Sequence, residues 1–224
     1  MKPDPKIIKS IYSIGLPAII SQALMSIMTY GMNIILVNIS ENVVTAYGLY
    51  YKVQQFILFT AFGLRDAITP IVSFNHGMRS KARVKEGIKY GILYTITIML
   101  AGLLIIELFA NPFSTLFGLS GETQEICINA MRIISLSFLF AGINIAYQGI
   151  FQALDSGMES LIISVLRQFL FVIPIAWGFS LLAIQNFDML WTVWTTFIIA
   201  EGLSCLVATI LMRKINHNII SNLE

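Results

Sequence analysis

Charged side chains are scarce in this chain. Of its 224 residues, 12% are charged and 57% are hydrophobic, and the formal net charge is only +2. So few charges leave too little polar surface for a soluble globular protein of this length. The composition therefore argues against a soluble fold and indicates a membrane protein, and the mild net charge does not indicate binding of nucleic acid.

Cysteine and histidine are also rare, with two of each. Cys127 and Cys205 fall in apolar segments, where cysteine usually behaves as a small hydrophobic residue. His76 and His217 lack the i, i+4 partner that a zinc-binding helix needs. The sequence contains no phosphate-binding Gly-Lys loop, no Gly-x-Ser-x-Gly elbow and no His-Glu-x-x-His motif. We therefore expect no metal site and no enzyme.

Long apolar segments are what the chain does contain. Six of them exceed the roughly 20 residues that a helix needs to cross about 30 Å of hydrocarbon. A helix satisfies its own backbone hydrogen bonds in lipid, whereas an isolated strand does not. We expect an all-α bundle of six transmembrane helices in which residues 1–224 form one lobe, with spans near 14–39, 46–74, 90–110, 125–153, 161–184 and 189–212.

Lysine and arginine are concentrated before the first span, after the second and after the sixth. These residues are Lys2, Lys6, Lys9, Arg79, Lys81, Arg83, Lys85, Lys89, Arg213 and Lys214. Since cytoplasmic loops are enriched in lysine and arginine, we expect a multi-pass protein of the cell membrane with both termini in the cytoplasm. The basic segment 79–89 is an ordinary cytoplasmic loop or a segment that contacts anionic lipid headgroups of the bilayer.

A stripe of amides runs along the fourth span. Asn144, Gln148 and Gln152 are spaced at i, i+4 and i+8, so they share one face of a helix. Polar side chains are unfavourable in lipid, so this face is expected to turn toward a cavity or another helix. Both alternatives remain open. Small residues at i, i+4 spacing on the same span favour close helix packing: Gly142 with Ala146, and Gly149 with Ala153.

Three charged residues interrupt the second and sixth spans. Arg65 and Asp66 are adjacent, and neighbouring residues on a helix point about 100° apart. They are therefore expected to pair with other helices, either as a structural brace or in contact with substrate or an ion. Glu201 lies near the middle of the sixth span and is the best candidate for a proton carrier. The structural alternative is that Lys52 or Arg132 neutralises it.

Motifs along the whole chain resemble the multidrug and toxic compound extrusion (MATE) family. They are Gly15-Leu16-Pro17-Ala18, the stretch from Ala46-Tyr47-Gly48 through Pro70 to Asn75-His76-Gly77-Met78-Arg79, and Tyr147-Gln148-Gly149-Ile150-Phe151-Gln152-Ala153-Leu154 followed by Arg167-Gln168. MATE transporters have twelve helices in two six-helix lobes, and they export organic cations in exchange for Na⁺ or H⁺. This chain resembles the second lobe.

The resemblance implies a central cavity lined by the first, second and fourth spans. Its substrate-binding candidates are Gln22, Asn33, Gln54, Asn144, Tyr147 and Gln148, although helix packing is the alternative for each. Asp66 and Glu201 are the candidates for coupling to Na⁺ or H⁺, and Arg65 and Arg167 are expected to be structural charges. No cofactor beyond the coupling ion is implied.

Two departures from the family pattern stand out. Some members bind the coupling cation through carboxylates on the first and fourth helices of this lobe, but spans 14–39 and 126–153 contain none. Asp155 also stands where the family usually has a glycine, so a different turn is expected there.

Three functions fit this sequence. The first is a half-length multidrug exporter that works as a parallel homodimer, since both lobes of a full transporter share one orientation. The second is a separated lobe that needs a partner chain carrying the first lobe. The third is a membrane interaction or regulatory subunit that transports nothing.

Overall fold

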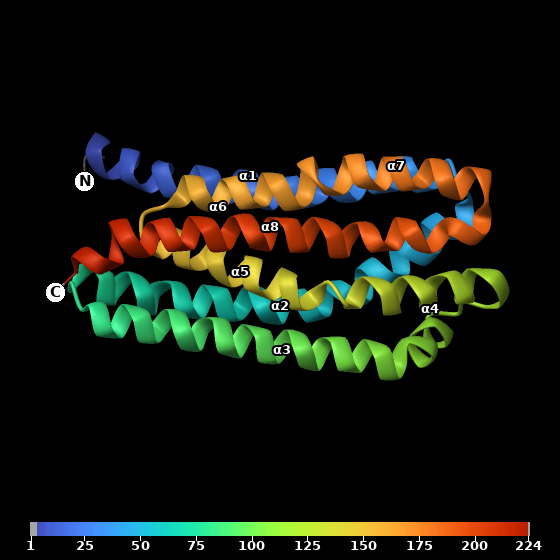
Figure 1. The fold of residues 1–224 in the computed structure, drawn as a ribbon, viewed down its shortest axis with the longest axis horizontal. Coiled ribbons are helices and arrows are strands. Elements are labelled where there is room, and N and C mark those ends of the chain that lie inside the picture. Colours follow the sequence, from blue (N-terminus) through green and yellow to red (C-terminus); the bar gives the residue numbers. More distant parts are fainter. Residues whose placement is uncertain (1–3, 224) are drawn as a thin grey trace.

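The computed structural model describes residues 4–223, which form a bundle of long helices (Figure 1). The long elements are α1 (Pro5–Val37), α2 (Glu41–Gly77), α3 (Lys81–Leu116) and α8 (Leu190–Asn218). The shorter ones are α4 (Gly121–Ser135), α5 (Phe138–Ala153), α6 (Gly157–Val165), a π-helical turn (Leu166–Leu170), α7 (Val172–Gln185) and two 3₁₀ turns (Phe187–Met189 and Ile220–Asn222).

The expected transmembrane bundle is confirmed. Over the described range, five helical segments are long and apolar enough to cross a membrane, counting α6 to α7 as one segment. Helices α4 and α5 meet at a bend of 52° and together pass the same test, so they give a sixth crossing when the bent pair is counted as one span. The fourth predicted span is therefore two helices rather than one.

The helices extend beyond the apolar segments that predicted them. Helix α2 begins at Glu41, five residues before the expected start, because the Ser40 hydroxyl accepts a hydrogen bond from the Val43 amide at 3.2 Å. Helix α1 begins at Pro5, where the Asp4 carboxylate accepts from the Lys6 amide at 2.8 Å. Side-chain caps decide where these helices start, whereas the apolar segments mark only their lipid-facing middle.

Both described chain ends lie at the same end of the bundle as the α2–α3 and α5–α6 connections (Figure 1). The α1–α2, α3–α4 and α7–α8 connections lie at the opposite end. The basic residues that follow α2 thus lie at the same end as Lys6 and Lys9, while Lys2 is outside the described residues. This is the alternation that the charge pattern predicted.

The turn at Asp155 is left-handed, with a φ of 57°. Glycine takes that conformation without a steric penalty, and aspartate is one of the few other residues that tolerate it. Asp155 therefore adopts a backbone conformation that glycine also adopts. Aspartate in place of the family's usual glycine does not by itself require a different turn.

The core consists of two apolar clusters. One includes Tyr47, Phe138 and Trp194, and the other includes Val72, Phe151 and Ala208. Along α8 the first cluster ends at Ala200 and the second begins at Ala208. Corresponding gaps occur in α2, in α5 and around the π-helical turn. Polar residues occupy these gaps, so a polar layer separates the two clusters.

Glycines bring α5 close to α2 and α3. A Cβ atom on Gly149 would meet the Arg65 side chain of α2 at 2.4 Å, and one on Gly142 would meet Met99 of α3 at 2.7 Å. Both distances are shorter than a real Cβ contact allows, so close approach depends on these glycines. The packing role expected for them is supported by this geometry.

Candidate functional site

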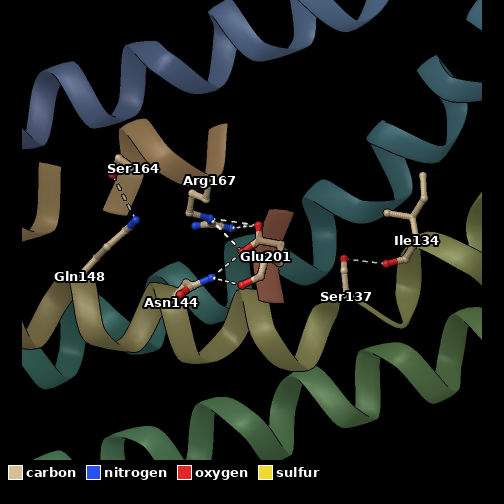
Figure 2. Close-up of polar contacts among 7 residues, drawn as sticks. All are labelled: Ile134, Ser137, Asn144, Gln148, Ser164, Arg167 and Glu201. Atoms are coloured by element: carbon tan, nitrogen blue, oxygen red, sulfur yellow. Dashed lines mark hydrogen bonds and ion pairs between the residues drawn. The ribbon is translucent and has the colours of Figure 1, made fainter. Parts of the chain in front are cut away.

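The centre of the polar layer is an ion pair between the π-helical turn and α8. The guanidinium group of Arg167 binds both carboxylate oxygens of Glu201, and its Nε donates to them at 3.0 and 3.1 Å (Figure 2). The two side chains are only 6% and 13% exposed. A carboxylate at this depth requires a partner with such geometry. Glu201 is thus paired with Arg167, and the prediction of Lys52 or Arg132 as its partner is wrong.

Asn144 of α5 completes this cluster. Its Nδ2 donates to Glu201 Oε2 at 2.7 Å and to the Glu201 main-chain carbonyl at 3.1 Å (Figure 2). Residues of α5, the π-helical turn and α8 therefore meet at one carboxylate. The other titratable groups near Glu201 are Tyr50 of α2 and Cys205 of α8.

The π-helical turn places Arg167 and Gln168 in the interior. The Phe171 amide donates to the Leu166 carbonyl at 2.9 Å, which lies five residues back instead of the four of an α-helix. Such turns are rare and occur frequently at functional sites. Both Arg167 and Gln168 are buried. No apolar periodicity in the sequence indicated this turn.

The remaining amides of the stripe bond to serines of α6. Gln148 Nε2 donates to Ser164 Oγ at 3.1 Å (Figure 2), and Gln152 Nε2 donates to Ser160 Oγ at 3.0 Å. The stripe therefore faces another helix, which was one of the two alternatives. The two serines were missed in the sequence, although their i, i+4 spacing within an apolar span is the signal that marks them.

Gln148 and Gln152 also border a small polar cavity, so the second alternative holds as well. This cavity of about 50 Å³ lies between α1, α2, α5 and the π-helical turn, and its polar lining is Ser21, Gln22, Arg65, Gln148, Gln152 and Gln168. Of the predicted substrate-binding residues, the structure brings Gln22 and Gln148 together here. Gln168 is a further lining residue that sequence reasoning did not single out.

Several buried oxygen atoms in this layer lack a hydrogen-bond partner among residues 4–223. They include Asn144 Oδ1 beside Glu201, the Tyr50 hydroxyl and Gln168 Oε1. Gln168 also lines the small cavity. Buried polar atoms are normally hydrogen-bonded, so such exceptions call for an explanation. Oxygen atoms of this kind beside a carboxylate can bind a water molecule that carries a proton, or a hard cation.

Other predicted residues lie apart from this cavity. Asn33 in α1 and Gln54 in α2 are half-buried and do not line it. Tyr147 stacks on Phe151, with ring centroids 5.9 Å apart, and lines a different cavity between α3 and α8. The structure thus gathers Gln22, Asn144 and Gln148 in or next to the polar layer and leaves the other three elsewhere.

Arg65 and Asp66 pair with each other, contrary to expectation. Arg65 Nη2 lies 2.8 Å from Asp66 Oδ1, and the side chains are 19% and 66% exposed. The long arginine side chain spans the angle between adjacent positions, and its guanidinium carbon lies 5.1 Å from the Phe62 ring centroid. The prediction that both pair with other helices is wrong, since no second helix supplies a closer charge in the part of the chain that the structure describes.

The bend between α4 and α5 lies within the first apolar cluster, between Ile134 and Phe138. The Ser137 hydroxyl donates to the Ile134 carbonyl at 2.7 Å (Figure 2). On the other side of the break, Ser135 Oγ donates to Glu107 Oε1 of α3 at 3.0 Å. Serine hydroxyls that bond to the backbone compete with the helical ladder. They account for a bend that contains no proline.

Comparison with known proteins agrees with this fold. The family model MatE matches residues 17–177, which is more than half of the chain. The multidrug export protein MepA of Staphylococcus aureus is 25% identical over 211 residues. That match covers 94% of this chain and 45% of MepA, so this chain spans about half the length of that relative.

Solved structures show the same architecture. A crystal structure of MATE in complex with MaL6 superposes with a TM-score of 0.90 at 23% identity, covering 99% of this chain and 50% of the other. A MOP superfamily transporter from Pyrococcus furiosus gives a TM-score of 0.84 at 24% identity, covering 95% and 47%. The bundle therefore has the fold of half of such a transporter. With its family match and its transmembrane helices, this chain belongs to the MatE family of membrane transporters.

Proposed function

We propose that this chain is a half-length multidrug exporter that removes organic cations from the cell in exchange for Na⁺ or H⁺. Its relatives named multidrug export protein support the activity, and their twofold greater length supports a requirement for a second lobe. A second copy of this chain, or a first lobe encoded by other sequence, supplies that lobe. The match to the MatE family and to multidrug export proteins carries the proposal. The polar cavity bordered by Gln22 and Gln148 supports it as a place for water or an ion between α1, α2 and α5, since its volume of about 50 Å³ is too small for an organic cation.

The Arg167–Glu201 pair is the proposed coupling element. A proton bound by Glu201 would remove the charge that holds Arg167, and the contact between the π-helical turn and α8 would weaken. Protonation of Glu201 would also affect α5, since Asn144 of α5 donates a hydrogen bond to the same carboxylate. Asp66 is the second coupling candidate, and its exposed side chain is accessible to a hydrated ion.

The proposed location is the cell membrane, with both termini and the α2–α3 loop in the cytoplasm. The clustering of lysine and arginine at one end of the bundle supports this orientation. Substrate would then enter from the end that carries the termini and leave at the end that carries Asn186.

Ethidium efflux from cells that produce only this chain tests the proposal. We expect efflux above that of cells without the chain, together with a homodimer trapped by chemical crosslinking in the same membranes. Replacing Gln148 with Leu should reduce efflux, because it removes an amide from the cavity, while Gln185→Leu at the exposed end of α7 serves as the control.

Other outcomes separate the alternatives. Efflux only when a first-lobe chain is co-produced would identify a separated lobe. A stable complex with another membrane protein, with no change in ethidium efflux or drug tolerance, would contradict transport and identify an interaction subunit.

A further inference from the structure

A second pocket, distinct from the polar layer, lies at the end of the bundle that carries both termini. It has a volume of about 400 Å³, compared with about 30 Å³ for one water molecule. Residues of α3 and α8 form its walls, Tyr147 of α5 contributes to its lining, and Ile220 of the last 3₁₀ turn closes one side. No transport role has been assigned to this pocket above.

Three cations line this pocket from two helices. Lys85 and Lys89 are one turn apart on α3, and Arg213 faces them from α8. Among the described residues that line the pocket there is no carboxylate, and none of these three cations forms an ion pair within residues 4–223. Nearby Glu86 lines a different cavity between α2 and α3. The pocket therefore concentrates uncompensated positive charge.

The rest of the lining is largely apolar. Ile88, Met212 and Ile220 lie beside the cations, and Thr209 lies one helical turn deeper along α8 than Arg213. The pocket thus combines three cations with apolar side chains that lie between and beside them. A phosphate headgroup with an attached acyl chain matches this combination, whereas a free phosphate ion would leave the apolar side chains unused.

We propose that this pocket binds the headgroup of an anionic phospholipid. The phosphate contacts Lys85, Lys89 and Arg213, and the upper acyl chain packs on Ile88 and Met212. Such a lipid bridges α3 and α8, so it stabilises the bundle at this end. The proposal depends on the membrane-spanning fold alone and stands whether or not the chain transports substrate.

Native mass spectrometry of the purified chain tests this site. The protein is equilibrated in detergent with equal amounts of phosphatidylglycerol and phosphatidylcholine, and the retained lipids are counted. We expect preferential retention of one phosphatidylglycerol molecule. The double variant Lys89→Gln with Arg213→Gln should lower the affinity for phosphatidylglycerol about 30-fold, since each basic residue contributes about a fivefold factor. The charge-preserving variant Lys89→Arg with Arg213→Lys should retain the lipid.

A matched control removes the same charge elsewhere. Arg83 and Lys214 are exposed residues at the same end of the bundle that do not line the pocket, and Arg83→Gln with Lys214→Gln should leave retention unchanged. Equal loss in both double variants would overturn the proposal, as would equal retention of the two lipids. Displacement of phosphatidylglycerol by millimolar inorganic phosphate would identify a free-phosphate site instead. Unfolding temperatures in phosphatidylcholine alone verify that each variant folds.

Discussion

At the scale of single residues, burial distinguishes the Arg167–Glu201 pair from the Arg65–Asp66 pair. Arg167 and Glu201 are almost fully enclosed, whereas Asp66 is largely exposed. An exposed pair contributes little to stability, because water and ions screen it. A buried pair whose partner is removed leaves a charge that nothing else compensates. The two pairs therefore have different consequences for folding.

Replacement of Arg167 with Met should lower the free energy of unfolding by about 3–5 kcal/mol, because Glu201 would stay buried without its partner. Replacement of Arg65 with Met should lower it by about 0–1 kcal/mol. Denaturant unfolding in detergent micelles measures both. The double variant Arg167→Met with Glu201→Met should recover part of the loss. Similar effects of the two single arginine variants would contradict this account of the polar layer.

The sequence identified Glu201 and the amide stripe but not their partners. Intramembrane charge and i, i+4 spacing are local signals, so Asn144, Gln148 and Glu201 were found from composition and periodicity alone. Arg167 lies 34 residues from Glu201 along the chain. Their contact depends on how α6, the π-helical turn and α8 pack, and no local pattern encodes that packing. The prediction for Arg65 and Asp66 failed for a local reason. Adjacent helical positions diverge, but the long arginine side chain spans the angle between them.

At the scale of elements, α5 is the helix on which the polar layer depends. It contacts α2, α3, α6 and α8, and its glycines set the distance to α2 and α3. Gly149 is the most crowded of them, because its main-chain carbonyl also lies 3.4 Å from the Thr69 hydroxyl. A side chain there would push α2 away from the cavity.

Replacement of Gly149 with Ala should destabilise the protein by about 1–3 kcal/mol, as overpacked core substitutions do. Gly63 in α2 is a matched control, because a Cβ atom there meets no atom within 4 Å. Gly63→Ala should be neutral or stabilise the helix by up to about 1 kcal/mol. Thermal unfolding in detergent distinguishes the two variants. A greater loss for Gly63→Ala than for Gly149→Ala would contradict close packing of α2 and α5.

Six apolar segments predicted the helices well, because hydrocarbon thickness fixes the length of a span. The same signal missed the break between α4 and α5. Apolar residues surround Ser135 and Ser137 on both sides, and hydropathy does not respond to a hydroxyl group that bonds to the backbone. It also missed the π-helical turn, because this turn differs from an α-helix in its main-chain hydrogen bonds and not in its apolar character. Hydropathy therefore located the membrane spans, while local hydrogen bonds shaped them.

At the scale of the whole molecule, the bundle is one lobe with both described chain ends on one side (Figure 1). A parallel pair of such lobes would place two polar cavities in the same orientation, as the two-lobe architecture requires. The resemblance and the charge pattern predicted one lobe with both termini on the same side. Neither signal identifies a partner lobe, because apolar segments alone do not distinguish a helix face that meets protein from one that meets lipid.

Accessibility of introduced cysteines tests the proposed orientation. In a background with Cys127 and Cys205 replaced by Ala, Asn186→Cys should react with a membrane-impermeant maleimide in intact cells. His217→Cys should react only after the cells are permeabilised, because α8 ends at the opposite side of the bundle. Both substituted positions are exposed. The reverse labelling pattern would invert the proposed topology.

Ion-driven dye flux through the purified chain in liposomes is the most direct test of the central claim. We expect ethidium transport that depends on an imposed Na⁺ or pH gradient, and we expect Glu201→Gln to abolish dependence on the pH gradient while the protein remains folded. An unchanged pH dependence in Glu201→Gln would leave Glu201 a purely structural role. Dye flux by the wild-type chain that responds to neither gradient would contradict ion-coupled export altogether.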